Sequence, residues 1–92
     1  MKRQRKTAKI ITQVDLAADL NVSRMRVHQF VEEGRLELRW DGRVDVQAAI
    51  ASLYMYWAPT PRWYEKPVGP IGQELRRKWQ AEAEASPAEF NF

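Results

Sequence analysis

The chain has 92 residues, and so short a chain buries only a modest fraction of its surface, which argues against a deep catalytic cleft. Its 15 Lys and Arg against 12 Asp and Glu give a formal charge of +3. It contains no cysteine, which excludes disulfides, thiol catalysis and cysteine-based zinc sites and gives no sign of an oxidising compartment, so we expect a cytoplasmic location.

The first 11 residues are expected to form a basic arm. Its cations are Lys2, Arg3, Arg5, Lys6 and Lys9, with no acid among them. Arms of this kind usually bind phosphate or anionic lipid, and the alternative is a solubilising tail. No apolar segment follows the arm, and no window approaches the roughly 20 apolar residues of a membrane span. We therefore expect a soluble protein that does not use a membrane.

A short helix is predicted at about 13 to 20. Thr12 can serve as its N-cap, with Asp15 three residues later in an approximate capping box. Asn21 then interrupts the apolar pattern and tolerates the left-handed backbone of a tight turn, while Val22 can fill the space between two helices. A second helix is expected to begin at once.

The stretch VSRMRVHQFVEEGRL, residues 22 to 36, predicts that second helix. Ser23 is a suitable N-cap and Gly34 a suitable C-terminal stop. One side of the helix is an apolar stripe, made by Val27, Phe30 and Val31. The residues that point away from this stripe or flank it are Met25, Arg26, His28, Gln29 and Glu32. The N-terminal half of the helix therefore turns a polar, basic side outward, where free backbone N–H groups also favour an anion.

A small β-hairpin is predicted from RLELRWDGRVDV, with strands at about 36 to 40 and 43 to 45. Apolar and polar residues alternate in the first strand, and Asp41-Gly42 is one of the strongest two-residue hairpin signals. The residues expected near the tip are Arg39, Trp40 and Arg43. We interpret Trp40 as a lid on the small core in preference to a wedge inserted into DNA.

Asp45 can cap a third helix, VQAAIASLYMYW, whose core-facing residues are Val46, Ala49, Ile50, Leu53, Tyr54 and Trp57. Met55 and Tyr56 fall largely outside this stripe. Residues 58 to 72 hold four of the five prolines, which block a helix and indicate a linker or a wrapping arm. Trp63 and Tyr64 within it favour docking onto another surface.

Residues 73 to 92 are expected to form a C-terminal helix and tail that contact another copy or a partner. Ile71, Leu75 and Trp79 lie four residues apart, which gives one narrow apolar stripe. Ser86-Pro87-Ala88-Glu89 resembles a further helix start. The contact made by Trp57, Trp63 and Trp79 stays open between a neighbouring copy, another protein and the chain's own domain.

Two short helices joined by a tight turn, followed by a hairpin and a third helix, are typical of a winged helix-turn-helix. The predicted fold class is therefore mainly α with a small β-hairpin wing: a winged helix-turn-helix at 12 to 57, followed by the proline-rich segment and the C-terminal helix. In such domains the second helix enters the major groove and the wing reaches neighbouring phosphates or the minor groove.

The run VSRMRVHQFVEEGRL followed by WDGRVDVQAAIASL resembles the MerR-like and excisionase-like winged helices. It is most similar to the N-terminal domain of Nu1-type phage terminase small subunits, in the V-S-R helix start, the G-R-L exit, the D-G-R/K hairpin and the V-D-x-x-A-A helix. The resemblance covers about 12 to 57. It implies a subunit that binds viral DNA for packaging, forms a homo-oligomer and recruits the terminase large subunit, and that is not itself an enzyme.

The resemblance also implies which residues contact double-stranded DNA. Base edges would be read by Arg24, Met25, His28 and Gln29, and phosphates would be held by Ser23 and Arg26. Arg suits guanine and Gln suits adenine, whereas Met makes only apolar contacts. Arg24 could instead pair with Asp19 or Glu32. Arg39 and Arg43 on the wing, and the basic arm, are expected to bind phosphates.

Other chemistry has little support in the sequence. His28 is the single histidine, so we expect no metal site and no cofactor. Glu32 and Glu33 are neighbours in a helix and point about 100° apart, so they cannot act as an acid/base pair. There is no phosphate-cradling glycine loop and no nucleophile with a partner, so we expect no enzyme. The alternatives to a terminase subunit are an excisionase, a small phage transcriptional regulator of the same fold, and a protein-interaction module on the same scaffold.

Overall fold

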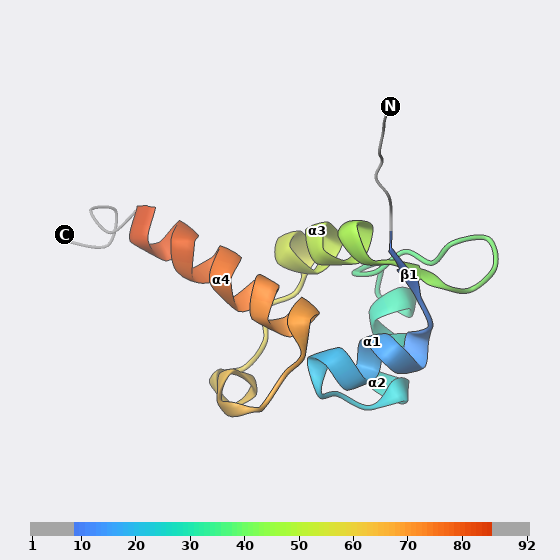
Figure 1. Ribbon diagram of the computed structural model, residues 1–92, viewed down its shortest axis with the longest axis horizontal. Coiled ribbons are helices and arrows are strands. Elements are labelled where there is room, and N and C mark those ends of the chain that lie inside the picture. Colours follow the sequence, from blue (N-terminus) through green and yellow to red (C-terminus); the bar gives the residue numbers. More distant parts are fainter. Residues whose placement is uncertain (1–8, 86–92) are drawn as a thin grey trace.

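The computed structural model describes residues 9–85, which are mainly helical with one two-stranded antiparallel sheet (Figure 1). The elements in chain order are β1 (Ile10–Ile11), α1 (Gln13–Leu20), α2 (Arg24–Glu32), β2 (Val44–Asp45), α3 (Val46–Tyr56), the 3-10 helix η2 (Pro61–Glu65) and α4 (Pro70–Ala85). None of the helices described here has the length and apolar character needed to cross a membrane. Lys2, Arg3, Arg5, Lys6 and the Ser86–Glu89 signature lie outside the described residues.

The predictions for α1 and α2 are confirmed, because both helices begin at the expected caps. The Asp15 N–H donates to Thr12 Oγ1 at 3.1 Å and the Thr12 N–H donates to the Asp15 carboxylate at 3.4 Å, which completes the capping box. Asn21 ends α1 in the left-handed conformation, with φ 51°. The Arg26 N–H then donates to Ser23 Oγ at 3.0 Å, so only a tight turn separates the two helices.

The small sheet differs from the predicted hairpin. β2 pairs with β1, with Ile11 opposite Val44, and the predicted strand at 36 to 40 is wrong. The Asp41-Gly42 turn does form, since the Gly42 N–H donates to the Arg39 carbonyl and the Arg39 N–H to the Arg43 carbonyl, both at 2.9 Å. Among the described residues no further ladder continues from this turn, and β2 pairs with β1 instead, so the last residues of the expected basic arm belong to the fold.

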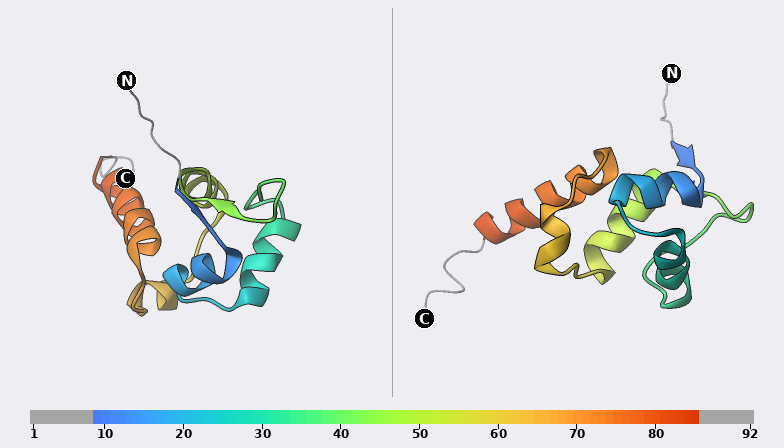
Figure 2. Two further views of the ribbon diagram at one scale, coloured as in Figure 1. Left: turned by 45° about the vertical axis from the view of Figure 1, so that its right-hand side comes forward. Right: turned by 90° about the horizontal axis from the view of Figure 1, so that it is seen from below.

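α3 crosses the middle of the molecule and carries much of the core (Figures 1 and 2). Asp45 caps it as predicted, accepting from the Ala48 N–H at 3.2 Å. Core-facing side chains of α1, α2 and α3 are almost completely buried, namely Leu16, Leu20, Val27, Phe30, Ala49 and Leu53, and so are Val44 of β2 and Leu75 of α4. Met55 and Tyr56 are exposed, as their position outside the stripe predicted.

The proline-rich segment is a wrapping arm and not a spacer. Trp63 in η2 is only 4% exposed, and its Nε1–H donates to the Leu20 carbonyl at 2.8 Å. The Asn21 side-chain amide donates to the Pro67 carbonyl at 2.9 Å, and the Gly69 N–H donates to the Asp19 carbonyl at 2.7 Å. The end of α1 therefore holds this segment at three points, which the sequence boundary at residue 58 did not suggest.

α4 begins at Pro70, three residues before the expected start, because proline suits the first turn of a helix, where no N–H partner is needed. Its predicted stripe faces the chain's own domain. Trp63 lies 4.9 Å from Trp57 and 6.1 Å from Trp79 between ring centroids, and Trp57 lies 6.0 Å from Trp79. The open question of what these three rings contact is thereby answered within the chain. Beyond Trp79 the helix is exposed and extends away from the core (Figure 1).

Candidate nucleic-acid interface

α2 separates an apolar side from an exposed polar side, as predicted. Val27 and Phe30 are fully buried, whereas all six candidate residues at its N-terminal cap and on its outer side are exposed: Ser23, Arg24, Met25, Arg26, His28 and Gln29. Among the described residues Arg24 forms no ion pair with Asp19 or Glu32. The Glu32 carboxylate instead lies 3.1 Å from His28 Nε2. The Arg24 guanidinium is therefore available to an external anion or base.

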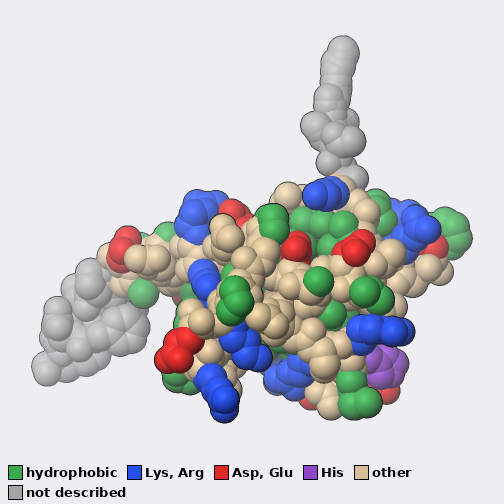
Figure 3. All heavy atoms as spheres, turned by 60° about the horizontal axis from the view of Figure 1, so that its bottom comes forward, with side chains coloured by type: hydrophobic (Ala, Val, Ile, Leu, Met, Phe, Trp, Pro, Cys, Tyr) green, Lys and Arg blue, Asp and Glu red, His purple; other side chains and the backbone are tan. Residues whose placement is uncertain are grey.

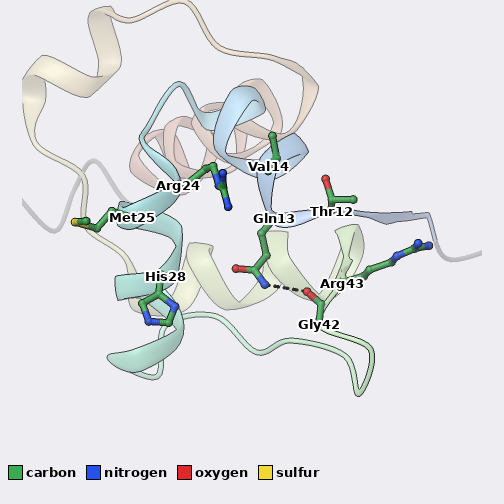
Figure 4. Close-up of a pocket in the computed structure, with 8 residues that line it drawn as sticks. All are labelled: Thr12, Gln13, Val14, Arg24, Met25, His28, Gly42 and Arg43. Atoms are coloured by element: carbon green, nitrogen blue, oxygen red, sulfur yellow. Dashed lines mark hydrogen bonds between the residues drawn. The ribbon is translucent and has the colours of Figure 1, made fainter.

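A groove of about 620 Å³ separates α2 from the turn at 40 to 43. We call it the α2 groove, and it is lined by Thr12, Gln13, Val14, Arg24, Met25, His28, Gly42 and Arg43. Figure 4 shows Arg24 and Gln13 pointing into it and His28 lying against α2, whereas Met25 and Arg43 point away from it. Gln13 Nε2 donates to the Gly42 carbonyl at 3.0 Å, which ties the start of α1 to the turn. No acid is among its lining residues, and the nearby Glu32 carboxylate is paired with His28, so Arg24 is the cation that an anion in the groove would meet.

The turn that faces α2 is held by the Asp41 carboxylate. This group accepts from the Arg43 N–H at 3.0 Å and lies 3.3 Å from Arg39 Nε. The Arg43 N–H, followed by the Arg39 guanidinium, holds the pKa of the Asp41 carboxyl below its usual value. Arg39 is thus partly neutralised, and Arg43 is the turn's cation with no acid partner among the described residues.

We expect the Asp41 carboxyl to titrate below an aspartate in an unstructured peptide, because its charged form accepts these two hydrogen bonds. The charged carboxylate therefore stabilises the turn fully at pH values above the pKa that Asp41 has in the unfolded chain. This stabilisation is lost as the pH falls through the lower pKa that Asp41 has in the folded protein. Carboxyl-detected NMR titration measures this shift directly, and Arg39→Ala should reverse part of it. An ordinary pKa for Asp41 in the folded protein would contradict the geometry of the turn.

Trp40 does not cover the core. Its side chain is 91% exposed at the tip of the turn, so the prediction of a lid is wrong. The core is filled by other side chains, with Leu36 buried shortly before the turn and Trp57 and Trp63 packed on each other. The Asp41-Gly42 turn then carries Trp40 outward into solvent.

Arg26 and Gln29 act as a pair on the surface of α2. Arg26 Nη1 donates to Gln29 Oε1 at 3.1 Å, and the Arg26 guanidinium lies 5.1 Å from the centroid of the Phe30 ring. Gln recognises adenine with both its amide oxygen and its amide nitrogen. Reading of adenine by Gln29 therefore requires Arg26 to release that oxygen.

A second groove, of about 520 Å³, lies on the other side of the α2 N-terminus. We call it the basic groove, because its lining includes Ser23, Arg26, Arg62 and Lys66 and no acid. Figure 3 shows Lys and Arg side chains at several places on one face of the molecule, together with Asp and Glu side chains and the single histidine near one edge. Arg62 and Lys66 were not among the predicted residues. The neighbouring Trp63 indicated that this segment docks onto a surface, but the sequence did not indicate which surface.

Lys9 is not gathered with the residues of α2. It is exposed and lines a third groove of about 390 Å³, between β1, α3 and α4. This groove also contains Asp19, Glu74 and Lys78, so its charges are mixed. Within residues 9–85 no group of three or more His, Asp and Glu side chains is placed to hold a metal ion.

Comparison of the chain with protein families, with curated proteins and with solved structures gave no match.

Proposed function

We propose that the chain binds double-stranded DNA through a winged helix-turn-helix, with α2 in the major groove and the turn at 39 to 43 as a short wing. The observation that carries this proposal is the α2 groove. Arg24 points into it and no acid lines it, Arg43 extends from the turn beside it, and the opposite side of α2 is anchored in the core. A helix with one buried side and one exposed basic side has the form that the major groove of B-DNA admits.

Arg24 and His28 are one helical turn apart and both line the α2 groove. In the proposed complex Arg24 donates to the acceptors of guanine, which is the commonest base-specific contact. Gln29 and Arg26 lie on the neighbouring part of the same helix and together face the next base or phosphate. α1, which packs against α2, would brace it across the DNA backbone.

The wing in this proposal is a single turn and not a two-stranded hairpin. Arg43 and Trp40 extend from it, and Gln13 holds it against the start of α1. A turn this short would reach only the phosphates or the minor groove next to the site of α2.

The more specific proposal is that the chain is the DNA-binding part of a phage terminase small subunit. It rests on the sequence resemblance over residues 12 to 57. It requires stable self-association and binding of the large subunit. An excisionase or a transcriptional regulator of the same fold is the rival, and sedimentation separates the two: an oligomer with and without DNA supports the packaging subunit, whereas a monomer at high concentration favours the rival.

The substitution Arg24→Ala tests whether Arg24 contacts a base edge in the major groove. We expect a loss of about 1 to 3 kcal/mol of binding free energy on a preferred duplex, selected from a random pool, and a smaller loss on a random duplex. Fluorescence anisotropy at several salt concentrations measures both. For the unaltered chain, log K should fall linearly with log salt by about 0.9 for each phosphate neutralised.

Arg77→Ala is the matched control, since Arg77 is an exposed arginine of α4 whose Nη2 lies 2.5 Å from Glu74. It should leave the preference between duplexes unchanged. If the unaltered chain binds no duplex at low salt, the proposed function is wrong. If Arg24→Ala weakens preferred and random duplexes equally, Arg24 holds a phosphate and does not read a base.

A further inference from the structure

The basic groove brings together cations from two parts of the chain that are far apart in sequence. Arg26 comes from the first turn of α2, and Arg62 and Lys66 come from η2 and its C-terminal end. The Arg62 and Lys66 side chains are exposed, and neither forms an ion pair within the described residues. Glu65 lies between them in sequence but does not line the groove.

The backbone that carries Arg62 and Lys66 is held firmly in place. Arg76 Nη2 donates to the Trp63 carbonyl at 2.7 Å and to the Lys66 carbonyl at 2.6 Å. The Arg76 guanidinium also lies 4.7 Å from the centroid of the buried Trp63 ring. Arg76 thus ties α4 to η2 by hydrogen bonds, in addition to the packing of Trp79 on Trp63. A ligand in the basic groove would meet cations whose main chain is already ordered, which reduces the entropy lost on binding.

The same groove is also bordered by the N-terminus of α2. Ser23, the N-cap of this nine-residue helix, lines it. The helix dipole therefore adds positive potential to that of the three side chains. The combination of two guanidinium groups, one ammonium group and a helix N-terminus suits a phosphate, because guanidinium groups donate paired hydrogen bonds to its oxygens.

We propose that Arg62 and Lys66, together with Arg26, form a phosphate-binding site for the backbone of the duplex bound by α2. This inference rests on the proposed function and extends it, because the proline-rich segment becomes part of the DNA-binding surface. With α2 in the major groove, the phosphates beside its N-terminus lie on the side of the basic groove. The contact strengthens binding to every sequence alike, since phosphates carry no sequence information.

The test is the double variant Arg62→Ala/Lys66→Ala in the full chain, with DNA binding measured by anisotropy on a preferred and a random duplex across a salt series. We expect roughly tenfold weaker binding to both duplexes at low salt. The slope of log K against log salt should become shallower by about one to two units, as expected for the loss of one or two phosphate contacts. Thermal melting followed by circular dichroism checks that the fold is kept.

The matched control is Arg77→Ala/Lys78→Ala, which removes the same charge from the exposed side of α4. It should change affinity and slope far less. If the two double variants lost equal DNA affinity, the loss would be explained by the change in net charge alone, and the inference would be overturned. So would an Arg62→Ala/Lys66→Ala variant that binds like the unaltered chain, or one that is weakened only on the preferred duplex. In these cases the proposed function stands, whereas failure of the unaltered chain to bind any duplex overturns both.

Discussion

Trp63→Ala is expected to destabilise the protein by roughly 3 to 5 kcal/mol, which is the usual cost of truncating a large buried aromatic side chain. The ring is 4% exposed and contacts Trp57 at 4.9 Å and Trp79 at 6.1 Å between centroids. The Leu20 carbonyl would also lose its hydrogen bond from Nε1, and an unsatisfied buried acceptor costs about 1 to 3 kcal/mol when it finds no other partner. For a small domain with a total stability of about 5 to 15 kcal/mol this is a large part of the whole.

Urea unfolding of the full chain, followed by circular dichroism, measures the change. Trp40→Ala is the matched control, because it deletes the same side chain at a position that is 91% exposed, and it should lie within about 0.5 kcal/mol of the unaltered chain. Trp63→Phe keeps a ring but loses the donor, so an intermediate loss is expected. Equal stability of Trp63→Ala and Trp40→Ala would mean that residues 58 to 85 are not part of the cooperative fold.

Gly72→Ala is the second substitution with a large expected effect. Gly72 is buried in the first turn of α4, and a Cβ there would lie 2.6 Å from Val68 Cβ and 3.1 Å from the Asp19 carbonyl oxygen. The Val68 Cβ is fixed to the backbone just before α4 and the Asp19 oxygen belongs to the backbone of α1, so relief of the overlap requires both segments to shift relative to α4. Overpacking of this kind typically costs about 1 to 3 kcal/mol.

The sign of this result is informative, because in an exposed helix interior the same substitution stabilises by about 1 kcal/mol. Thermal or urea unfolding decides between the two outcomes. Glu84→Ala, on the exposed part of the same helix, is the control and should change stability little. A Gly72→Ala variant that is more stable than the unaltered chain would show that α4 does not pack as closely on the end of α1 as described.

Both substitutions test the same feature, which is the attachment of the C-terminal segment to the helix pair. α1 is held to η2 through Leu20 and Trp63, and to the start of α4 through Asp19 and Gly69. This attachment also fixes where Arg62 and Lys66 lie relative to α2. A substitution that loosens it should therefore weaken the proposed phosphate contact without altering the residues of α2.

The helices α1, α2 and α3 could be predicted from the sequence because the forces that bound them are local. Thr12, Ser23 and Asp45 each accept a hydrogen bond from an N–H three residues later, and Asn21 adopts a left-handed conformation that few other residues tolerate. The outward side of α2, and with it the exposure of His28 and Gln29, followed from helical spacing alone, whereas Arg24 entered the candidate residues through the family resemblance.

The tertiary structure decided which distant segments meet. A short apolar run can pair with any strand of suitable length, so the preference of Val44 for Ile11 over the residues at 36 to 40 depends on the whole core. The local sequence could not predict that Trp40 is exposed and Trp63 is buried, since each tryptophan directly follows an arginine. The basic groove joins residues 26, 62 and 66, and only the docking of Trp63 under α4 brings them together, because long-range contacts leave no periodic signal in the sequence.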